Sequence, residues 1–276
     1  MLLQTFLKDI SSEDNFYIMV KNLVSIITPS YNCSKFIERT IKSVKNQTYT
    51  DWEMLITDDC STDNSVDVIR EIAAQDPRIK LFLLDKNSGA GVARNNSIEH
   101  AQGKYIAFLD SDDMWMPDKL EKQIAFMKEK QCAMSYTSMV NIDEQDNEIG
   151  VEISPRIHTF NQNKRDDKIG FSSAIYDQEK VGKIFMPTIR KRQDWGLVLS
   201  VLKICKVAYG IKQPLAYYRM GHDSLSKKKL ALVKYNIAAY KSVLGWGTLR
   251  AYIFFFFVYL PSYLSKKVFL KMINNY

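Results

Sequence analysis

Short apolar runs alternate with amphipathic stretches through the first half of the chain. Runs of strand length lie at 24–28, 52–57, 79–84 and 105–109. Between them, hydrophobic side chains recur at the three- and four-residue spacing of helices that pack on a core. Strands and helices that alternate at this length predict βαβ units. The pattern therefore predicts an α/β fold with a mostly parallel sheet and helices on both faces.

The pattern loosens after about residue 130. A strand is predicted at 133–140, a polar hairpin or loop at 141–150, and a long surface loop at 154–170. A helix is expected at about Gln193–Cys205, followed by a short strand at 207–211.

Beyond Ser226 two helices are predicted, divided near Gly245–Gly247. The second contains the charge-free stretch Ala251–Ser265, whose 15 residues fall short of the roughly 20 that cross a bilayer. Its flanking residues, Arg250 and Lys266, favour an element that lies at a membrane surface. The alternative is a helix that packs on the rest of the chain or on a second subunit.

Charge predicts an anionic partner. The 276 residues are 46% hydrophobic, which is enough to bury a full core, and the net charge is +7. Such an excess suits nucleic acid, a phosphorylated substrate or an acidic membrane face. It is concentrated late in the chain, because Lys203–Lys241 holds nine Lys or Arg against one acid, Asp223.

The cysteines and the N-terminus indicate a reducing compartment. Four cysteines lie far apart without a Cys-x-x-Cys pair, which argues against a structural zinc site and a disulfide framework. The first residues lack the basic start and long apolar core of a signal peptide. We interpret residues 1–22 as an N-terminal extension.

Polar loops follow three of the predicted strands, at Pro29–Asn32, Asp58–Asp63 and Asp110–Asp113. The carboxyl ends of parallel strands meet at one edge of a sheet, where ligands bind in such folds. The third loop, Asp-Ser-Asp-Asp, masses like charges that are costly unless a cation neutralises them. Hard oxygen ligands favour Mg²⁺ or Mn²⁺, which commonly bridge to nucleotide phosphates. The alternative is a solvated acidic turn that caps a helix near Pro117.

Two common nucleotide motifs do not occur. The sequence has neither the G-x-x-x-x-G-K-[ST] loop of many ATPases nor a G-x-G-x-x-G after a strand, which weakens ATPase and dehydrogenase functions.

The ordered set of motifs resembles the family 2 glycosyltransferases with a GT-A fold, especially bacterial enzymes that build O-antigen, capsule or other surface polysaccharides. The matching segments are 24–32, 58–63, 89–95, 108–113, 193–195 and 218–226. Each is weak alone, but their order is specific. The resemblance covers residues 23 to about 226.

The resemblance implies a domain organisation. A Rossmann-like GT-A catalytic domain would occupy 23–226, with a nucleotide-binding half at 23–130 and an acceptor half at 131–226. Residues 227–276 would form a helical appendage that associates with the membrane.

The resemblance also implies an activity. A sugar would move, with inversion, from a nucleotide-sugar donor, usually a UDP-sugar, to a lipid-linked or growing glycan. The enzyme would need Mn²⁺ or Mg²⁺ and would work in the cytoplasm, peripherally at the inner face of the cell membrane. Nucleic acid would not be a partner, and a homodimer stays open.

Nucleotide contacts are carried over from the family by position. Thr28, Pro29 and Tyr31 would line the base and ribose pocket. Asp59 would accept a hydrogen bond from uracil, with Asp58 beside it. The alternative is that both carboxylates are ordinary turn residues. The family's usual Gly before Ser61 is Cys60 here.

Contacts to the diphosphate and metal are carried over in the same way. Arg94 would lie near the diphosphate, and the alternative is an ordinary ion pair. Asp110 would face the ribose, Ser111 would lie in the nucleotide-sugar site, and Asp112 would hold the metal. His222 would sit near the metal or diphosphate, although many relatives place this His differently.

Asp194 would be the general base. An acceptor hydroxyl that attacks an anomeric carbon must lose its proton, and one carboxylate within hydrogen-bond reach can take it. The alternative role for Asp194 is the N-cap of its helix.

Two other functions compete with this one. A non-catalytic subunit of a polysaccharide assembly complex would bind nucleotide sugar without turnover. A nucleotidyltransferase would need a basic, Gly-rich loop for a triphosphate, whereas Ser30–Phe36 supplies only Lys35.

Overall fold

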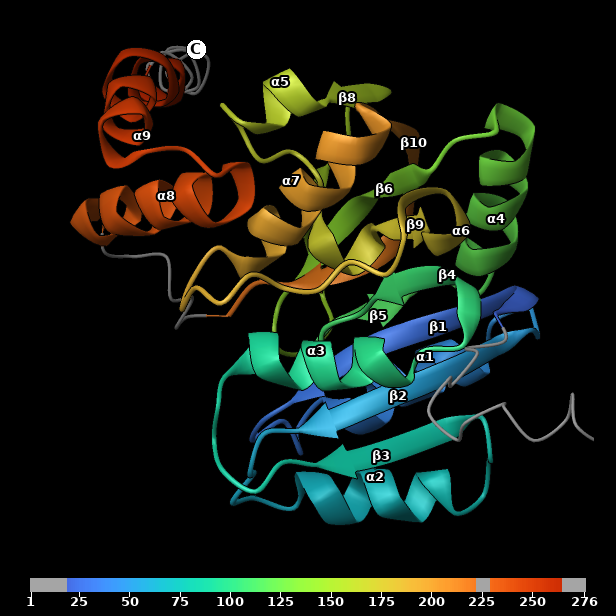
Figure 1. Ribbon diagram of the computed structural model, residues 1–276. Helices are drawn as coiled ribbons and strands as arrows, with labels where there is room; N and C mark the ends of the chain where they lie inside the picture. The colour runs from blue at the N-terminus through green and yellow to red at the C-terminus, as the bar shows by residue number, and fades with distance from the viewer. Residues whose placement is uncertain (1–18, 222–228, 265–276) are drawn as a thin grey trace, which may run out of the picture.

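The computed structural model describes residues 19–221 and 229–264 (Figure 1). Within them, a ten-stranded sheet has the order β3-β2-β1-β4-β9-β6-β10-β5, with β7 beside β6 and β8 beside β10. Its parallel half consists of β1 (Val20–Ser30), β2 (Trp52–Asp58), β3 (Ile79–Leu83) and β4 (Gly103–Phe108). These are the four strands that the apolar runs predict. Because β1 begins at Val20, the end of the predicted extension belongs to the sheet.

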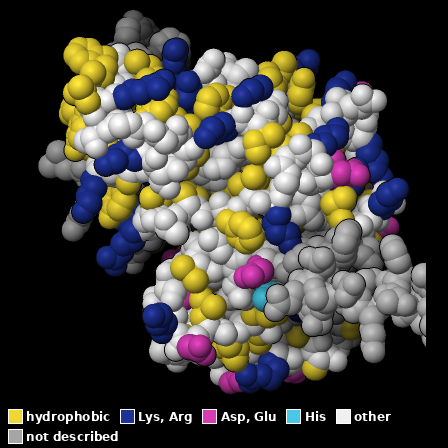
Figure 2. All heavy atoms as spheres, viewed as in Figure 1, with side chains coloured by type: hydrophobic (Ala, Val, Ile, Leu, Met, Phe, Trp, Pro, Cys, Tyr) yellow, Lys and Arg dark blue, Asp and Glu magenta, His cyan; other side chains and the backbone are white. Residues whose placement is uncertain are grey.

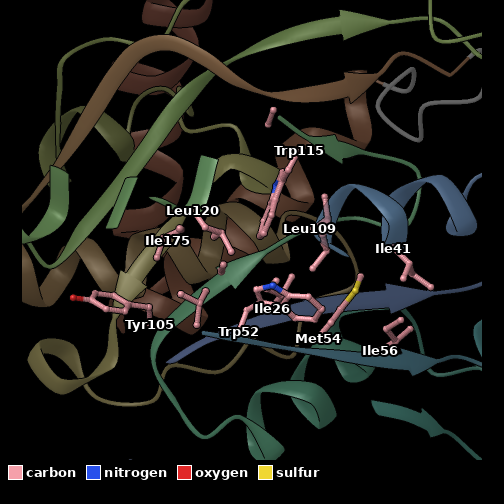
Figure 3. Close-up of a cluster of buried hydrophobic side chains, with 14 of the residues drawn as sticks. Ile26, Ile41, Trp52, Met54, Ile56, Tyr105, Leu109, Trp115, Leu120 and Ile175 are labelled. Atoms are coloured by element: carbon pink, nitrogen blue, oxygen red, sulfur yellow. The ribbon is translucent and has the colours of Figure 1, made fainter. Parts of the chain in front are cut away.

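Three helices cover one face of the parallel half: α1 (Ile37–Lys45), α2 (Ser65–Ala73) and α4 (Lys119–Lys130). Their apolar side chains bury a cluster with strand residues, as Figure 3 shows for Ile41 and Leu120 beside Ile26 and Met54. Full burial of one such side chain stabilises the fold by about 1.5–3 kcal/mol. The cluster therefore holds the strand ends that carry the site.

The opposite face is covered by α3 (Ala90–His100) and α7 (Gln193–Cys205). Their buried residues pack with Ile27, Leu55 and Phe108 in a second cluster. Helices on both faces are confirmed, and so is the predicted helix at 193–205. The second cluster joins the parallel half of the sheet to the later part of the chain.

The later strands add a mostly antiparallel half to the sheet. In this half, β9 is antiparallel to both of its neighbours, β4 and β6. The strands β6 and β10 are parallel to each other. The elements are β5 (Met114–Trp115), β6 (Met134–Ile142), β7 (Glu148–Glu152), β8 (Ile157–Thr159), α5 (Phe160–Asn163), a 3-10 turn (Phe171–Ser173), β9 (Ile175–Asp177), α6 (Gln178–Val181) and β10 (Val207–Arg219).

Two predictions about this half are wrong in part. The segment 154–170 is not only a surface loop, because it contains β8 and α5 and buries His158 and Asn163. The strand predicted at 207–211 continues to Arg219. Register shifts around Pro214, which cannot donate a ladder hydrogen bond, interrupt its regular pattern.

The C-terminal helices pack against α7. They are α8 (Lys229–Leu244), α9 (Thr248–Phe254) and a π-helical segment, η3 (Phe255–Tyr259). The predicted break at 245–247 is confirmed, with Gly245 at φ +68°. A third apolar cluster joins Trp195 of α7 to Tyr240 and Phe255. In the described ranges, no helix is long and apolar enough to cross a membrane.

Candidate active site

Hydrogen bonds join the loops after β1 and β2 at one edge of the sheet. Asn32 donates its backbone N–H to Ser61 Oγ over 2.9 Å, and the Asn32 side chain accepts from the Thr62 N–H at 2.8 Å. Below this pair, Ser30 Oγ donates to Asp58 Oδ1 at 2.8 Å. The convergence predicted from strand alternation is confirmed for these loops.

Asp58 acts as a buried brace. Besides Ser30, it accepts hydrogen bonds from the N–H and Oγ of Ser61, at 2.8 and 2.5 Å. Only 2% of the residue is exposed. Cys60, between the two, has φ +61°, a conformation in which glycine carries no steric cost. Its Sγ lies 3.0 Å from the Leu84 carbonyl oxygen. The turn therefore keeps its shape without the family's glycine.

Asp59 holds the start of α3. Its two carboxylate oxygens accept the N–H groups of Ser88 and Gly89, at 2.6 and 2.7 Å. A carboxylate oxygen has more than one lone pair, so these bonds leave capacity for another donor. The predicted contact of Asp59 with uracil stays a prediction.

The predicted base-pocket residues differ in exposure. Thr28 and Pro29 are buried at the end of β1, whereas Tyr31 is 51% exposed. The hydroxyl of Thr28 has no hydrogen-bond partner among the described residues. Tyr31 is thus the member of this group that is free to pack on a base.

Side chains from α1 and α3 fix the acidic loop 110–113. Thr40 Oγ1 of α1 lies 2.9 and 2.8 Å from the carbonyl oxygens of Ser111 and Asp113. Arg94 of α3 forms an ion pair with Asp110. Arg94 is therefore in the site, but its partner is a loop carboxylate.

The three carboxylates of the loop have different surroundings. Asp113 is buried and accepts the Arg219 N–H at 2.9 Å. Burial, followed by the charges of Asp112 and Asp110, raises its pKa well above the usual value. Burial and the charge of Asp110 also raise the pKa of Asp112 to about 6. Asp113 is structural, and Asp112 keeps its partial access to solvent.

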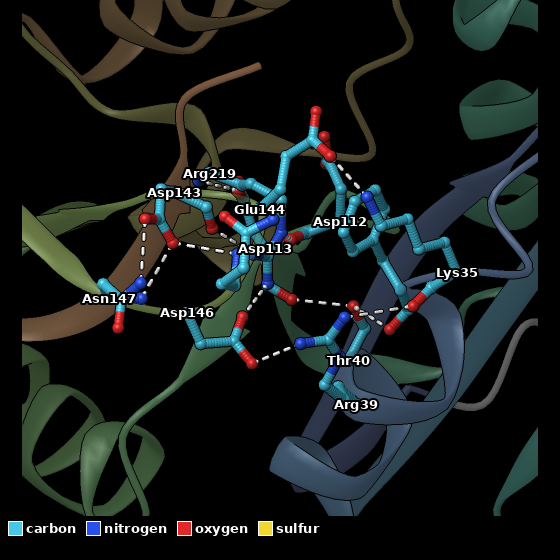
Figure 4. A network of polar contacts seen from close by, with 12 residues as sticks. Lys35, Arg39, Thr40, Asp112, Asp113, Asp143, Glu144, Asp146, Asn147 and Arg219 are labelled. Atoms are coloured by element: carbon cyan, nitrogen blue, oxygen red, sulfur yellow. Dashed lines mark hydrogen bonds and ion pairs between the residues drawn. The ribbon is translucent and has the colours of Figure 1, made fainter.

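Arg219 ties the acidic loop to the hairpin between β6 and β7 (Figure 4). Its Nε donates to the Asp112 carbonyl at 2.9 Å, and its Nη2 donates to Asp146 Oδ1 at 2.5 Å. Its Nη1 donates to the Asp143 carbonyl. The guanidinium also lies 4.5 Å from the centre of the Phe36 ring. Sequence reasoning placed this Arg in a motif but missed its structural role.

Asp194 lies in the first turn of α7 and is not its N-cap, which is Arg192. The alternative role is therefore wrong. Tyr218 relates Asp194 to the acidic loop. Burial raises the Tyr218 pKa to about 12, helped by the negative charges of Asp113, Asp110, Asp112 and Asp194. The negative charges of the acidic loop and of the candidate base therefore both act on the Tyr218 phenol.

A contact between α3 and α7 brings the start of α7, which carries Asp194, against the parallel half of the sheet. A Cβ atom at Gly91 would come within 2.3–2.6 Å of the Gln193 side chain. These atoms are the far end of a flexible side chain, so the distance shows close contact between Gln193 and Gly91 and not a strict need for glycine. The start of α7 is therefore packed directly on α3.

Asp167 is a second carboxylate that sequence reasoning missed. Burial, and then the negative charge of Asp194, raises its pKa to about 7, while Arg192 opposes the shift. One of its oxygens is buried without a hydrogen-bond partner in the described ranges. Nothing in the local sequence distinguishes it from the acid at 166.

Asp110 and Asp112 fit a divalent cation. Burial, and then the charge of Asp110, raises the Asp112 pKa. Mg²⁺ or Mn²⁺ commonly uses one or two protein carboxylates, with water and phosphate as further ligands. His222 lies outside the described residues. Within residues 19–221 and 229–264, no group of three His, Cys, Asp or Glu is arranged to hold a metal.

The sequence matches the family described as "Glycosyl transferase family 2" over residues 25–177. The chain belongs to this family. The glycosyltransferase TuaG of Bacillus subtilis strain 168, attributed to teichuronic acid biosynthesis, is 44% identical over 81% of this chain and 89% of its own. WfgD of Escherichia coli is 36% identical over 77% of this chain and 83% of its own. It is named a UDP-Glc:alpha-D-GlcNAc-diphosphoundecaprenol beta-1,3-glucosyltransferase.

Solved glycosyltransferase structures show the same fold. Staphylococcus aureus TarS, in complex with UDP, has a TM-score of 0.62 and 18% identity over 83% of this chain and 68% of its own. The mannosyltransferase PcManGT of Pyrobaculum calidifontis, in complex with GDP-Man and Mn²⁺, has a TM-score of 0.61 and 16% identity, over 84% of this chain and 69% of its own. The predicted GT-A fold is confirmed.

Proposed function

We propose that this family 2 enzyme transfers a sugar, with inversion, from a UDP-sugar to a lipid-diphosphate-linked glycan of a bacterial surface polysaccharide. The observation that carries the proposal is the packing of Gln193, the neighbour of Asp194, on Gly91 of α3, the helix whose Arg94 pairs with Asp110 of the acidic loop. This contact supports a base close to the acidic loop. TuaG and WfgD, which match most of this chain, support the polysaccharide and the lipid-linked acceptor.

Donor binding is assigned to the edge of the parallel strands. Tyr31 is exposed there for stacking on the base, and Asp59 keeps acceptor capacity for the uracil N–H. Thr28, Pro29 and Asp58 shape the pocket from beneath. The proposed catalytic domain therefore begins at Val20, where β1 begins, and not at 23. Its end at 226 and an acceptor half that begins near 131 stay predictions.

Departure of the diphosphate leaves negative charge that the protein must offset. Arg94 brings a buried guanidinium to Asp110, so the loop is already partly neutralised before a ligand arrives. Asp112 and, by the family's motif order, His222 would hold Mn²⁺ or Mg²⁺. When bound, such a cation would supply Lewis-acid stabilisation of the leaving charge.

Asp194 takes the proton of the attacking hydroxyl. The acceptor oxygen forms its bond to the anomeric carbon as the bond to the diphosphate oxygen breaks, and the proton moves to an Asp194 oxygen. A positioned base contributes about 10²–10⁴-fold to such a step. One base is enough for inversion, since no covalent glycosyl-enzyme forms.

Association with the inner face of the membrane is part of the proposal. Residues 224–276 contain nine Lys or Arg and no Asp or Glu. In Figure 2, hydrophobic side chains gather over the C-terminal helices, with Lys and Arg around them. Phe256 and Phe257 are 48% and 77% exposed. Apolar residues rimmed by basic ones suit an anionic lipid surface.

Release of UDP from UDP-glucose, with a synthetic GlcNAc-diphospholipid as acceptor and Mn²⁺ present, tests the proposal. Asp194→Asn should lower kcat by at least about 100-fold and leave UDP affinity unchanged. The exposed Asp67→Asn is the matched control and should behave as wild type. Asp112→Asn should weaken Mn²⁺-dependent UDP binding in calorimetry.

Two results would contradict the assignments. Wild-type turnover by Asp194→Asn would remove Asp194 as the base. UDP binding without turnover of any UDP-hexose, even with bacterial lipid extract as acceptor, would favour the non-catalytic subunit.

A further inference from the structure

The residue before the base-bearing helix has a strained conformation. Arg192, the N-cap of α7, has φ +65° and ψ +26°. The left-handed region costs a non-glycine residue about 1 kcal/mol or more. Such a conformation persists where surrounding contacts enforce it. Asp194 is two residues further on, so the turn at Arg192 sets where that carboxylate lies.

The Arg192 side chain makes contacts in three directions. Its Nη2 donates to the Tyr259 hydroxyl at 3.0 Å. Its Nη1 lies 3.9 Å from Asp167 Oδ2. The guanidinium also lies 5.5 Å from the centre of the Trp195 ring. An Arg has a planar fork of donors, so it can face several partners in a fixed geometry.

Tyr259 belongs to the C-terminal helices and is well held there. It ends the π-helical segment η3, is 8% exposed, and stacks on Phe255 with ring centres 5.3 Å apart. Its ring also lies 6.4 Å from that of Trp195. π-Helical turns occur frequently at functional sites. The Tyr259 hydroxyl is thus presented to Arg192 by a rigid aromatic cluster.

We propose that Arg192 is a positioning residue for Asp194, and that Tyr259 of the C-terminal helices holds Arg192 in place. The inference rests on Asp194 as the base of the proposed function. It makes the C-terminal helices part of the catalytic apparatus as well as a candidate membrane contact.

Arg192 also stands among the carboxylates near the candidate base. Asp167 lies 3.9 Å from its Nη1, and the charges of Asp194, Arg192 and Asp166 all act on Asp167. A loosened Arg192 should therefore disturb this charge balance as well as the turn that carries Asp194.

Tyr259→Phe is the main test, because it removes the hydroxyl and keeps the ring. We expect kcat for UDP-glucose transfer to fall by about tenfold, with donor KM and UDP affinity unchanged. Tyr252→Phe, on the exposed side of α9, is the control and should match wild type.

Two further variants separate positioning from loss of fold. Arg192→Gln should lower kcat by up to about 100-fold, and Arg192→Lys should recover part of it by retaining charge. A merely structural effect would lower the melting temperature and UDP affinity together with kcat.

Wild-type kcat in Tyr259→Phe and Arg192→Gln would overturn the inference. If Asp194→Asn were also active, the base assignment itself would fail, which is a distinct result. Melting temperature and UDP calorimetry on each full-length variant show whether it is folded, and a folded, UDP-binding variant with unaltered kinetics counts against the proposal.

Discussion

At the residue scale, similar carboxylates have different roles because their surroundings differ. Asp58 accepts three hydrogen bonds in a buried turn, whereas Asp113 is buried beneath the loop that presents Asp112. Asp167 has a buried oxygen without a partner and lies near Asp194. Sequence spacing identifies acidic clusters but does not say which members face solvent.

Asp167→Asn should stabilise the protein at alkaline pH. The folded-state pKa is raised from 3.8 to about 7, so the stability that this group contributes is full below its unfolded pKa and is lost as pH rises through about 7. Asn avoids the cost of ionisation. Urea unfolding at pH 8.5 should show a gain on the order of 1–2 kcal/mol, after allowance for partial exposure.

The same comparison of wild type with Asp167→Asn at pH 4 provides the control. At that pH the folded wild type, like the variant, is largely uncharged at position 167. A gain that was equal at pH 4 and pH 8.5 would show that ionisation is not its cause.

At the element scale, prediction succeeds where the pattern is regular and local. The four parallel strands and α7 follow from hydrophobic periodicity, and the break after α8 follows from Gly245. Prediction fails for β8 and α5, which are three and four residues long. Periodicity needs longer windows than that. The candidate site follows from loops after strands, but Arg192 and Arg219 act through contacts distant in sequence.

Arg219→Lys should destabilise the fold, because β10, the acidic loop and the β6–β7 hairpin all meet at this guanidinium. A lysine lacks the fork that reaches several acceptors. Removing these contacts from a side chain that is 2% exposed should lower the free energy of unfolding by about 2–4 kcal/mol.

Urea unfolding measures this change. Arg39→Lys is the matched control, because Arg39 also pairs with Asp146 but has a 37% exposed side chain. Its loss should stay under about 1 kcal/mol. Equal effects of the two variants would show that Arg219 is not the organising residue.

At the scale of the whole molecule, the sheet joins two unlike parts. The parallel half carries the acidic loop and the proposed nucleotide site, and the C-terminal helices pack on α7 through aromatic residues. Phe255 and Tyr259 face this interior, whereas Phe256 and Phe257 face outward. The sequence offered two interpretations of the segment 251–265, namely packing on the rest of the chain and contact with a membrane. The inward face confirms the packing, and contact of the outward face with lipid stays a prediction.

Binding to vesicles that contain 30% phosphatidylglycerol tests the lipid contact. Phe256→Ser with Phe257→Ser should reduce co-sedimentation by about tenfold or more, because each Phe buried in lipid contributes about 1.5–3 kcal/mol. Leu83→Ser, at an exposed position on β3, is the control. Salt at 0.5 M should also weaken binding, since surface charges are then screened. Unchanged sedimentation would leave the outward face for a protein partner.

The hydrogen bond between Tyr259 and Arg192 has a consequence for engineering. Retargeting such an enzyme by grafting on the tail of a relative treats that tail as an exchangeable module. Here a graft would replace a hydroxyl that supports the turn ahead of Asp194. Chimeras that bring no phenol opposite position 192 should reach their new location and lose turnover there, and restoring that single pair should bring the activity back.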